Sequence, residues 1–101
     1  HKAFSESKEL EQIAHYALYH HEKWNGNGYP EGLKHEEIPL VSRILGLVDA
    51  WDAMRSNRAY RNPLSENKAI KEIKKNKNTQ FAPKVTETFL ETINNSQDQI
   101  V

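Results

Sequence analysis

The sequence predicts an all-α fold of about four helices, because apolar residues recur at helical spacing in separate segments of the chain. Stretches rich in Gly, Pro and Asn separate these segments, and no window alternates apolar and polar residues as a strand would. The 101 residues are enough for one domain or part of one, with a single modest core. We therefore expect one helical bundle that occupies the whole chain.

The first predicted helix covers residues 6–21, where apolar residues repeat at steps of three and four. This stripe places His21 on the buried face, and Ser5 or Ser7 would cap the start of the helix. A loop must follow over residues 25–32, because its Gly and Pro residues are incompatible with a regular helix.

The other three predicted helices begin at recognisable start signals. Pro39 suits the first turn of a second helix, Ser65 is a good N-cap for a third, and Pro83 opens a fourth. The polar tail over 95–101 is expected to fray. The residues expected inside are, helix by helix, Val41, Ile44, Leu45 and Val48, then Ala69, Ile70 and Ile73, then Val85, Phe89 and Ile93.

Composition narrows the classes of function. The chain carries 14 basic and 14 acidic residues, so bulk charge gives no reason to expect a nucleic-acid polymer as partner. We interpret the basic cluster over 68–77 as a solvated helix face. The chain has no cysteine, which excludes disulfides and thiolate metal sites and fits a cytoplasmic location. The longest apolar run, 44–48, is far too short to span a bilayer.

The most informative stretch covers residues 20–30, which read His-His-Glu-Lys-Trp-Asn-Gly-Asn-Gly-Tyr-Pro. Neutral imidazole is a common metal ligand, and here two histidines precede a turn that lets backbone approach a ligand. Asp49 and Asp52 are the carboxylates that could complete such a site. Histidine and carboxylate form the ligand set of Zn, Fe or Mn sites that lack thiolates. The pattern favours a metal site.

Each of these residues also has a structural explanation. His20 and His21 could be helix-end histidines favoured by the helix dipole, with one of them packed in the core. An acidic residue on an apolar stripe is costly unless it is paired or bound to metal. Asp49 and Asp52 could therefore be buried partners of an arginine, either Arg43, Arg58 or Arg61.

Other aromatic residues near the candidate site have less specific explanations. Tyr29 is either a core plug between glycines or a stacking platform for a base. Packing is the better explanation for Trp24 and Trp51. His15 points elsewhere on its helix, and His35 is expected to be exposed.

The stretch from His20 to Pro30 resembles the signature of the HD-GYP domain, which reads His-His-Glu and then Asp-Gly-x-Gly-Tyr-Pro. The resemblance covers nearly the whole chain, so it is highly specific. It continues through Gly32-Leu33-Lys34, Glu37-Ile38-Pro39, Arg43-Ile44, Val48-Asp49, Asp52-Ala53 and Arg58-Ala59-Tyr60-Arg61.

The resemblance implies a bacterial phosphodiesterase of the metal-dependent HD phosphohydrolase type, with its helical-bundle fold. Such domains hydrolyse cyclic di-GMP to a linear dinucleotide or to GMP. They use two or three divalent metal ions, iron or manganese in most cases. The ligand roles of the family fall on His20, His21 and Asp49.

The resemblance also implies contacts outside the metal cluster. The loop formed by Gly28, Tyr29 and Pro30 is linked in the family to substrate access and to contacts with GGDEF-domain proteins. Arg58 matches a phosphate or structural contact. Asp52 and Glu22 are second-tier candidates.

The chain departs from the HD-GYP pattern in ways that leave an alternative open. The defining His-Asp doublet is absent, so we expect residues 1–101 to be the C-terminal half of the domain. Asn25 and Ala59 replace the usual aspartate and proline, Ala82 replaces an acidic helix cap, and His35 replaces a glycine. The alternative is therefore a degenerate signalling module that binds a partner or nucleotide without hydrolysis. A purely structural helical domain is a third class.

An incomplete domain has two expected consequences. We expect this chain alone to be inactive, because three ligands cannot hold a bridged pair of metals. We also expect its open apolar face to pair with a second copy as a homodimer, since large exposed apolar patches mark contacts and two-fold dimers are the commonest oligomers.

Overall fold

The computed structural model describes the backbone of residues 2–100 and the side chains of residues 6–96. Within these residues the secondary structure is helical, apart from two isolated β-bridges, which confirms the predicted all-α class. The elements are α1 (Lys2–Leu18), the short 3-10 helix η1 (His35–Glu37), α2 (Leu40–Arg55), α3 (Glu66–Lys75) and α4 (Pro83–Ile100).

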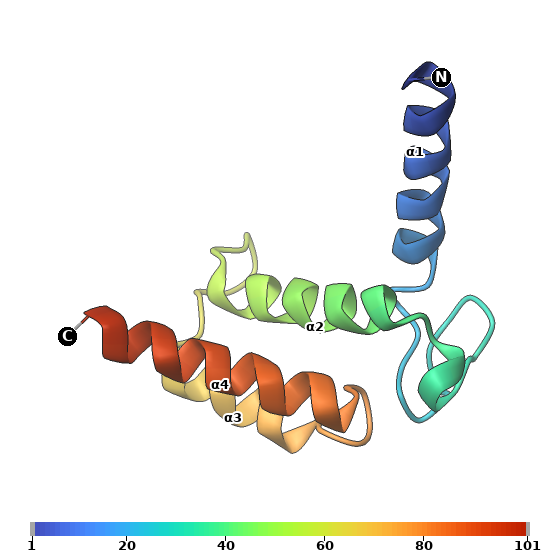
Figure 1. Cartoon of the computed structure of the whole chain (residues 1–101). Helices are drawn as coiled ribbons and strands as arrows, with labels where there is room; N and C mark the ends of the chain where they lie inside the picture. The colour runs from blue at the N-terminus through green and yellow to red at the C-terminus, as the bar shows by residue number, and fades with distance from the viewer. Residues whose placement is uncertain (1, 101) are drawn as a thin grey trace.

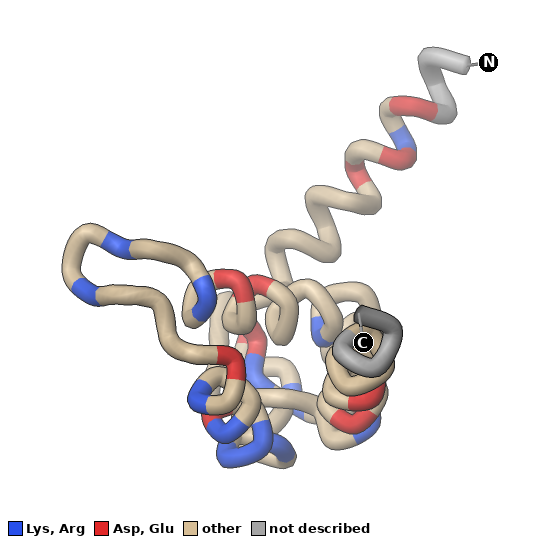
Figure 2. Tube along the Cα trace, turned by 90° about the vertical axis from the view of Figure 1, so that its left-hand side faces the viewer, with Lys and Arg blue, Asp and Glu red and all other residues tan. Residues whose placement is uncertain are grey.

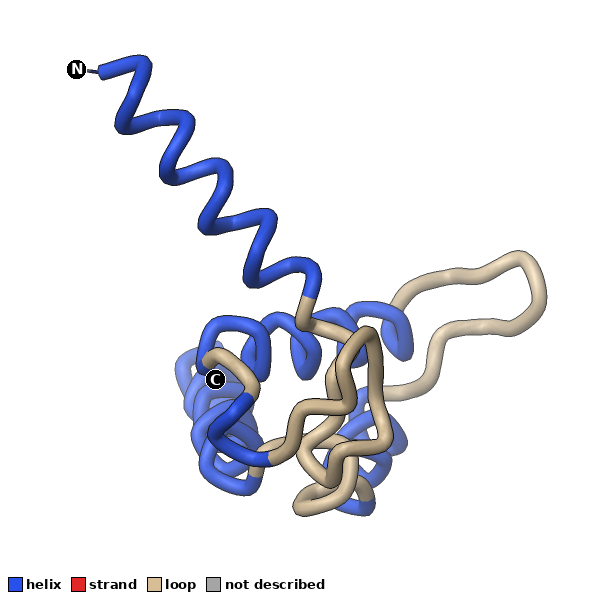
Figure 3. Tube along the Cα trace, turned by 90° about the vertical axis from the view of Figure 1, so that its right-hand side faces the viewer, coloured by secondary structure: helices blue, strands red, loops and turns tan. Residues whose placement is uncertain are grey.

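The helices α2, α3 and α4 form the body of the molecule, and α1 rises away from it (Figure 1). Helices α3 and α4 lie side by side, with α2 packed against both. The loops between α1 and α2 gather below the end of α1 (Figure 3). In the described part of the chain, no helix has both the length and the hydropathy that a bilayer crossing needs.

The core lies where α2 meets α3 and α4. Its buried residues are Leu47, Ile73 and Phe81, and Trp51 packs against them with its ring 5.3 Å from that of Phe89. Packing is therefore the correct explanation for Trp51. The other apolar residues packed on this core are Ala50, Met54, Val85, Phe89 and Leu90.

The apolar stripe of α2 formed by Val41, Ile44, Leu45 and Val48 lies on the open face of this chain, as expected for an incomplete domain, and not in the core where it would face in a complete one. Leu47 is 1% exposed, whereas Val48 is 45% exposed, and Val41, Ile44 and Leu45 are exposed as well. Successive residues of an α-helix differ by about 100° around its axis, so a shift of one or two positions selects a different face. Apolar residues occur on several sides of α2, so the sequence pattern alone did not show which face meets the core.

The start signals of the last two helices are confirmed. The Oγ of Ser65 accepts a hydrogen bond from the backbone N–H of Lys68 at 3.2 Å, and Ala69 and Ile73 are fully buried. Asn76 caps the end of α3, and α4 begins at Pro83 as predicted. Helix α4 runs on to Ile100, so the expected loss of helix after Asn94 is not seen, and Val101 lies outside the described residues.

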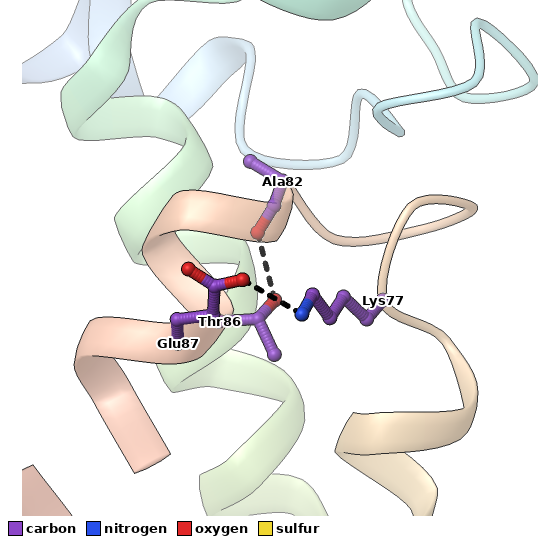
Figure 4. A network of polar contacts seen from close by, with 4 residues as sticks. All are labelled: Lys77, Ala82, Thr86 and Glu87. Atoms are coloured by element: carbon purple, nitrogen blue, oxygen red, sulfur yellow. Dashed lines mark hydrogen bonds and ion pairs between the residues drawn. The ribbon is translucent and has the colours of Figure 1, made fainter. Parts of the chain in front are cut away.

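Polar contacts fix the turn between α3 and α4 (Figure 4). The hydroxyl of the buried Thr86 donates to the carbonyl of Ala82 at 2.8 Å. The Nζ of Lys77 lies 2.8 Å from Oε1 of Glu87 and lowers the pKa of that carboxyl group. These contacts hold the segment 76–82 against the first turns of α4, and this segment forms one wall of the candidate site.

Helix α1 differs from its prediction at both ends. It begins at Lys2 and ends at Leu18, so Ser5 and Ser7 lie inside the helix and do not cap it. The apolar stripe is uncovered, with Leu10 67% exposed, and His21 is exposed as well. The described residues supply no partner for this stripe, because α1 touches the body mainly at its C-terminal end (Figure 1).

Candidate functional site

Two small residues of α2, Ser42 and Gly46, bring the turn that carries His20 and His21 (the histidine turn) close to that helix. The hydroxyl of Ser42 donates to the carbonyl of Tyr16 at 2.7 Å, and Ser42 is buried. A Cβ on Gly46 would lie only 2.7 Å from the carbonyl oxygen of His20, so only glycine permits this approach. Asp49 follows on the same face of α2, one turn further along. Sequence reasoning missed both residues, although a glycine inside a helix was a signal of close packing.

This packing places His20 opposite Asp49. The Nε2 of His20 lies 4.0 Å from Oδ2 of Asp49. The Nδ1 of His20 is hydrogen-bonded to the carbonyl of Ala17, which can only accept, so the proton sits on Nδ1. In the neutral imidazole, the lone pair is then on Nε2, the nitrogen that lies toward the carboxylate. A backbone carbonyl on the second ring nitrogen is typical of histidines that bind metal.

His21 lies beside this pair but has different contacts. Its ring centroid is 3.8 Å from that of His20 and 4.8 Å from that of Tyr29, on which it stacks at 19°. In the described part of the chain, no three His, Asp or Glu residues surround one point closely enough to hold a metal ion. The structure thus brings His20 and Asp49 face to face, with His21 next to them.

The carboxylate of Glu22 organises the loop that follows. It is 8% exposed and accepts hydrogen bonds from the backbone N–H groups of Glu31, at 2.7 Å, and Leu33, at 2.8 Å. Gly28 packs on the backbone of the turn, because a Cβ there would lie 2.4 Å from the carbonyl oxygen of His21. These contacts account for the position of Tyr29 against His21.

A second contact ties the same loop to the end of α1. The hydroxyl of Tyr19 donates to Oε1 of Glu31 at 3.0 Å, and this hydrogen bond raises the pKa of Tyr19 above its ordinary value of 10.0. Tyr29 itself is 60% exposed, so it is not a core plug between the glycines. The loop that carries Gly28, Tyr29 and Pro30 is thus held by backbone contacts and presents Tyr29 to solvent.

Asp52 and Arg58 lie outside this constellation. Asp52 is exposed, and its Oδ1 accepts from the hydroxyl of Ser56 at 3.4 Å. Arg58 is exposed on the loop 56–65, which stands out from the body (Figure 2). Its backbone pairs with that of Arg61 across the loop.

The arginines do not neutralise the two aspartates. The Nε of Arg43 donates to the carbonyl of Ile38 at 3.0 Å, and Nη2 of Arg61 donates to the carbonyl of Ala53 at 2.8 Å. Among the described residues, no guanidinium group of these two arginines or of Arg58 pairs with Asp49 or Asp52. The explanation of the aspartates as buried partners of arginine is therefore wrong.

Five of the candidate residues line one cavity of about 350 Å³, namely His20, His21, Glu22, Tyr29 and Asp49. It lies between the histidine turn, α2 and the segment that joins α3 to α4. Packing does not account fully for Trp24, because it is half-buried and faces this cavity. The polar and aromatic lining residues are His20, His21, Glu22, Lys23, Trp24, Tyr29, Arg43, Asp49, Gln80 and Phe81.

Comparison with known proteins gives a consistent set of relatives. A model of the HD domain family matches residues 1–85. A cyclic di-GMP phosphodiesterase of Thermotoga maritima is 44% identical over 86 residues, which are 85% of this chain and 23% of that protein. A 3'3'-cGAMP-specific phosphodiesterase 2 of Vibrio cholerae is 38% identical over 85 residues, 83% of this chain and 16% of that protein.

A solved structure shares the fold. The crystal structure of a cyclic GMP-AMP-specific phosphodiesterase from V. cholerae superposes with a TM-score of 0.70 at 30% sequence identity. The match covers 84% of this chain and 19% of that one. This chain thus spans less than a quarter of the length of each of these relatives.

Proposed function

This chain belongs to the HD domain family, and we propose that it is part of a metal-dependent phosphodiesterase that hydrolyses cyclic dinucleotides. The resemblance to HD-GYP domains is supported by relatives that are named cyclic di-GMP phosphodiesterases. On this proposal the longer protein opens cyclic di-GMP to a linear dinucleotide or to GMP, and it acts in the cytoplasm.

The observation that carries the proposal is the approach of His20 to Asp49. Two ligand bonds of about 2.0–2.2 Å that meet at about 90–110°, the angles usual for such ions, join donor atoms roughly 3.0–3.5 Å apart. The 4.0 Å between Nε2 and Oδ2 is wider than this, so a small rotation of the exposed Asp49 side chain would let one divalent ion contact both atoms. An imidazole nitrogen and a carboxylate oxygen suit iron and manganese, and we propose these metals for a complete site of two or three ions.

The residues of the chain then have distinct roles. Divalent ions, when bound, supply charge stabilisation and water activation for phosphodiester hydrolysis. His20 and Asp49 hold one ion, and His21 supplies a further donor beside it. Glu22 holds the loop in place through two backbone N–H groups. Arg58, on the exposed loop 56–65, contacts a phosphate of the substrate.

Partners would meet the exposed parts of this arrangement. Tyr29 is largely exposed, so we place the contact with a GGDEF-domain protein at the loop of Gly28, Tyr29 and Pro30. A homodimer would cover the exposed apolar faces of α1 and α2.

A non-catalytic signalling module is the second candidate. It is favoured by the lack of a cluster of three ligands in the described residues, and by Asn25 in place of the usual aspartate. The Oδ1 of Asn25 accepts from the backbone N–H of Asn27 at 3.0 Å, so asparagine keeps the turn without a carboxylate. Such a module would keep the loop and the cavity but hydrolyse nothing.

Metal binding tests the proposal directly. We expect calorimetric titration of this chain with Mn²⁺ to show weak binding that His20→Ala or Asp49→Asn abolishes. Asp52→Asn is the matched control, because Asp52 is an exposed carboxylate on the same helix outside the cavity. Binding that survives both site variants, or is lost equally in the control, would contradict the proposal.

Hydrolysis separates the two candidate functions. The longer protein should cleave cyclic di-GMP with Mn²⁺ or Fe²⁺. This chain alone should have a turnover number well below about 1 per second, which is the low end of typical enzyme values. Chromatography of the nucleotide products measures both rates. A longer protein that binds metal but leaves cyclic dinucleotides intact would be a signalling module instead.

A further inference from the structure

We propose that the part of the cavity lined by Trp24, Arg43 and Gln80 binds one nucleotide unit of the substrate, with the Arg43 guanidinium on its phosphate. The inference rests on the proposed function, since it assumes that the ligand is a nucleotide. It adds a phosphate contact distinct from Arg58, which does not line this cavity.

Arg43 is held so that one edge of its guanidinium remains available. Its Nε donates to the carbonyl of Ile38 at 3.0 Å, and its Cζ lies 5.9 Å from the ring centroid of Trp24. The two terminal amino groups have no acceptor among the described residues. A guanidinium anchored on one side offers two parallel N–H donors on the other, which is the geometry that phosphate oxygens accept.

The charges around the cavity favour an anion near Arg43. Lys23 lines the same cavity, so two basic side chains face it. Of the two carboxylates that also line it, Glu22 already accepts two backbone N–H groups, and Asp49 faces His20. A phosphate beside Arg43 would therefore lie in a cavity with a second basic residue in its lining, while the two carboxylates of that lining have partners of their own.

Trp24 and Gln80 provide the means to bind a base. The backbone N–H of Trp24 donates to the carbonyl of Gln80 at 3.0 Å, so the two residues are held next to each other. The Gln80 side-chain amide has no partner in the described part of the chain and can both donate to and accept from a base edge. An indole ring can stack on any base, and here a base would replace the contact of Trp24 with the exposed His35 ring, whose centroid is 4.7 Å away.

The cavity is large enough for this ligand. Its volume of about 350 Å³ lies at the lower end of the range for small-molecule sites, roughly 300–1,000 Å³. One nucleotide unit suits that size better than a whole cyclic dinucleotide. The other half of the substrate would then extend toward the exposed Tyr29 and the candidate metal donors.

The test compares two ligands that differ only in phosphate. GMP and guanosine are titrated into this chain with a chelator present, so that no metal contributes. In ¹H–¹⁵N NMR spectra, GMP should shift the side-chain signals of Arg43 Nε–H, Trp24 indole N–H and Gln80 amide. Guanosine should bind at least about tenfold more weakly, the loss expected when a hydrogen bond to a charged group is removed.

A matched pair of variants isolates the guanidinium. Arg43→Gln should weaken GMP binding by at least about tenfold and leave guanosine binding unchanged. Arg55→Gln is the control, because Arg55 also donates to a backbone carbonyl, that of Leu64 at 3.0 Å, and lies 6.0 Å over Trp51, yet outside the cavity. Arg43→Lys keeps the positive charge but loses the paired N–H donors of the guanidinium. Its affinity for GMP should therefore fall between that of the unmodified chain and that of Arg43→Gln.

The outcomes separate this inference from the proposed function. Equal binding of GMP and guanosine to the unmodified chain, or shifts that spare Arg43, would overturn the inference without any variant. If the phosphate effect at Arg43 is found but the longer protein hydrolyses no cyclic dinucleotide, the proposed function fails and the nucleotide site stands. If hydrolysis is found and Arg43 does not respond, only the inference fails.

Discussion

Gly46 carries no reactive group, yet it sets the distance between the two candidate metal donors. The carbonyl of His20 rests where a side chain at position 46 would begin. Ser42, one turn earlier on α2, fixes the same contact by a hydrogen bond to Tyr16. The site thus depends on two residues with no role in its chemistry, and a search for ligands alone would not find them.

Gly46→Ala should therefore disturb the site more than the fold. Alanine favours the helix by about 1 kcal/mol over glycine, whereas overpacking against a backbone atom costs about 1–3 kcal/mol. The two effects partly cancel, so we expect a small net loss of stability in urea denaturation. Calorimetry should show a clear loss of Mn²⁺ affinity, because His20 must move away from Asp49. Unchanged affinity in this variant would contradict the account.

The exposed ion pair between Lys77 and Glu87 gives a pH-dependent prediction. The hydrogen bond from Lys77 lowers the pKa of Glu87 from its ordinary value of 4.5. The stabilisation is therefore fully present above about pH 4.5 and is lost as the pH falls through the lowered pKa. It is small, because the pair is exposed to solvent.

An NMR titration of the Glu87 carboxyl carbon measures this shift. Lys77→Met should raise the midpoint toward the ordinary value, whereas Lys71→Met, a change at an exposed lysine of α3 outside this pair, should not. If the titration midpoint of Glu87 is the same with and without Lys77→Met, the pair does not form in solution.

At the level of elements, the sequence predicted the starts of α3 and α4 well, but it predicted neither the start of α1 nor the helix faces that pack together. Ser65 and Pro83 are local signals, and the structure has helices where these signals place them. The buried face of α2 depends on where α3 and α4 pack, and a helix with apolar residues on several sides does not contain that information in its periodicity. The exposed apolar stripe of α1 was missed for the same reason, since an amphipathic pattern does not show which other element, if any, packs against it.

The candidate site was predicted in part for a similar reason. His20, His21 and Asp49 were found from residue type and resemblance, and all three line one cavity. The structural role of Glu22 was missed, because its hydrogen bonds reach backbone groups nine and eleven residues ahead and leave no local pattern. Arg43 was considered only as a partner for the aspartates, because nothing in the sequence indicated that it faces the cavity.

The loop between α1 and α2 should loosen when Glu22 is changed. Glu22→Gln leaves one oxygen for two backbone donors, and an unsatisfied donor costs about 1–3 kcal/mol. We expect faster hydrogen exchange at the amides of Glu31 and Leu33. Glu37→Gln is the matched control in the same loop, since Glu37 is exposed and accepts from only one backbone N–H, that of Lys34. If these amides exchange at the same rate in both variants, the carboxylate of Glu22 does not hold the loop as proposed.

For the molecule as a whole, exposed apolar surface predicts self-association of this chain. Leu10 and Ile13 on α1 are exposed, and Ile44 and Val48 on α2 line an apolar groove of about 280 Å³ that α4 borders. Sedimentation at several concentrations should show a dimer that dissociates on dilution. Val48→Glu should shift the equilibrium to monomer, whereas Leu47 is buried and offers no such test. A strict monomer at all concentrations would rule the dimer out.

The most direct test of the metal site is a crystal of this chain soaked in Mn²⁺ and measured for anomalous scattering. The account predicts a peak between Nε2 of His20 and Oδ2 of Asp49, with both bonds at about 2.0–2.2 Å. His21 should lie beside that peak, with its ring still stacked on Tyr29. A peak elsewhere, or an empty space between His20 and Asp49 at saturating Mn²⁺, would contradict the account.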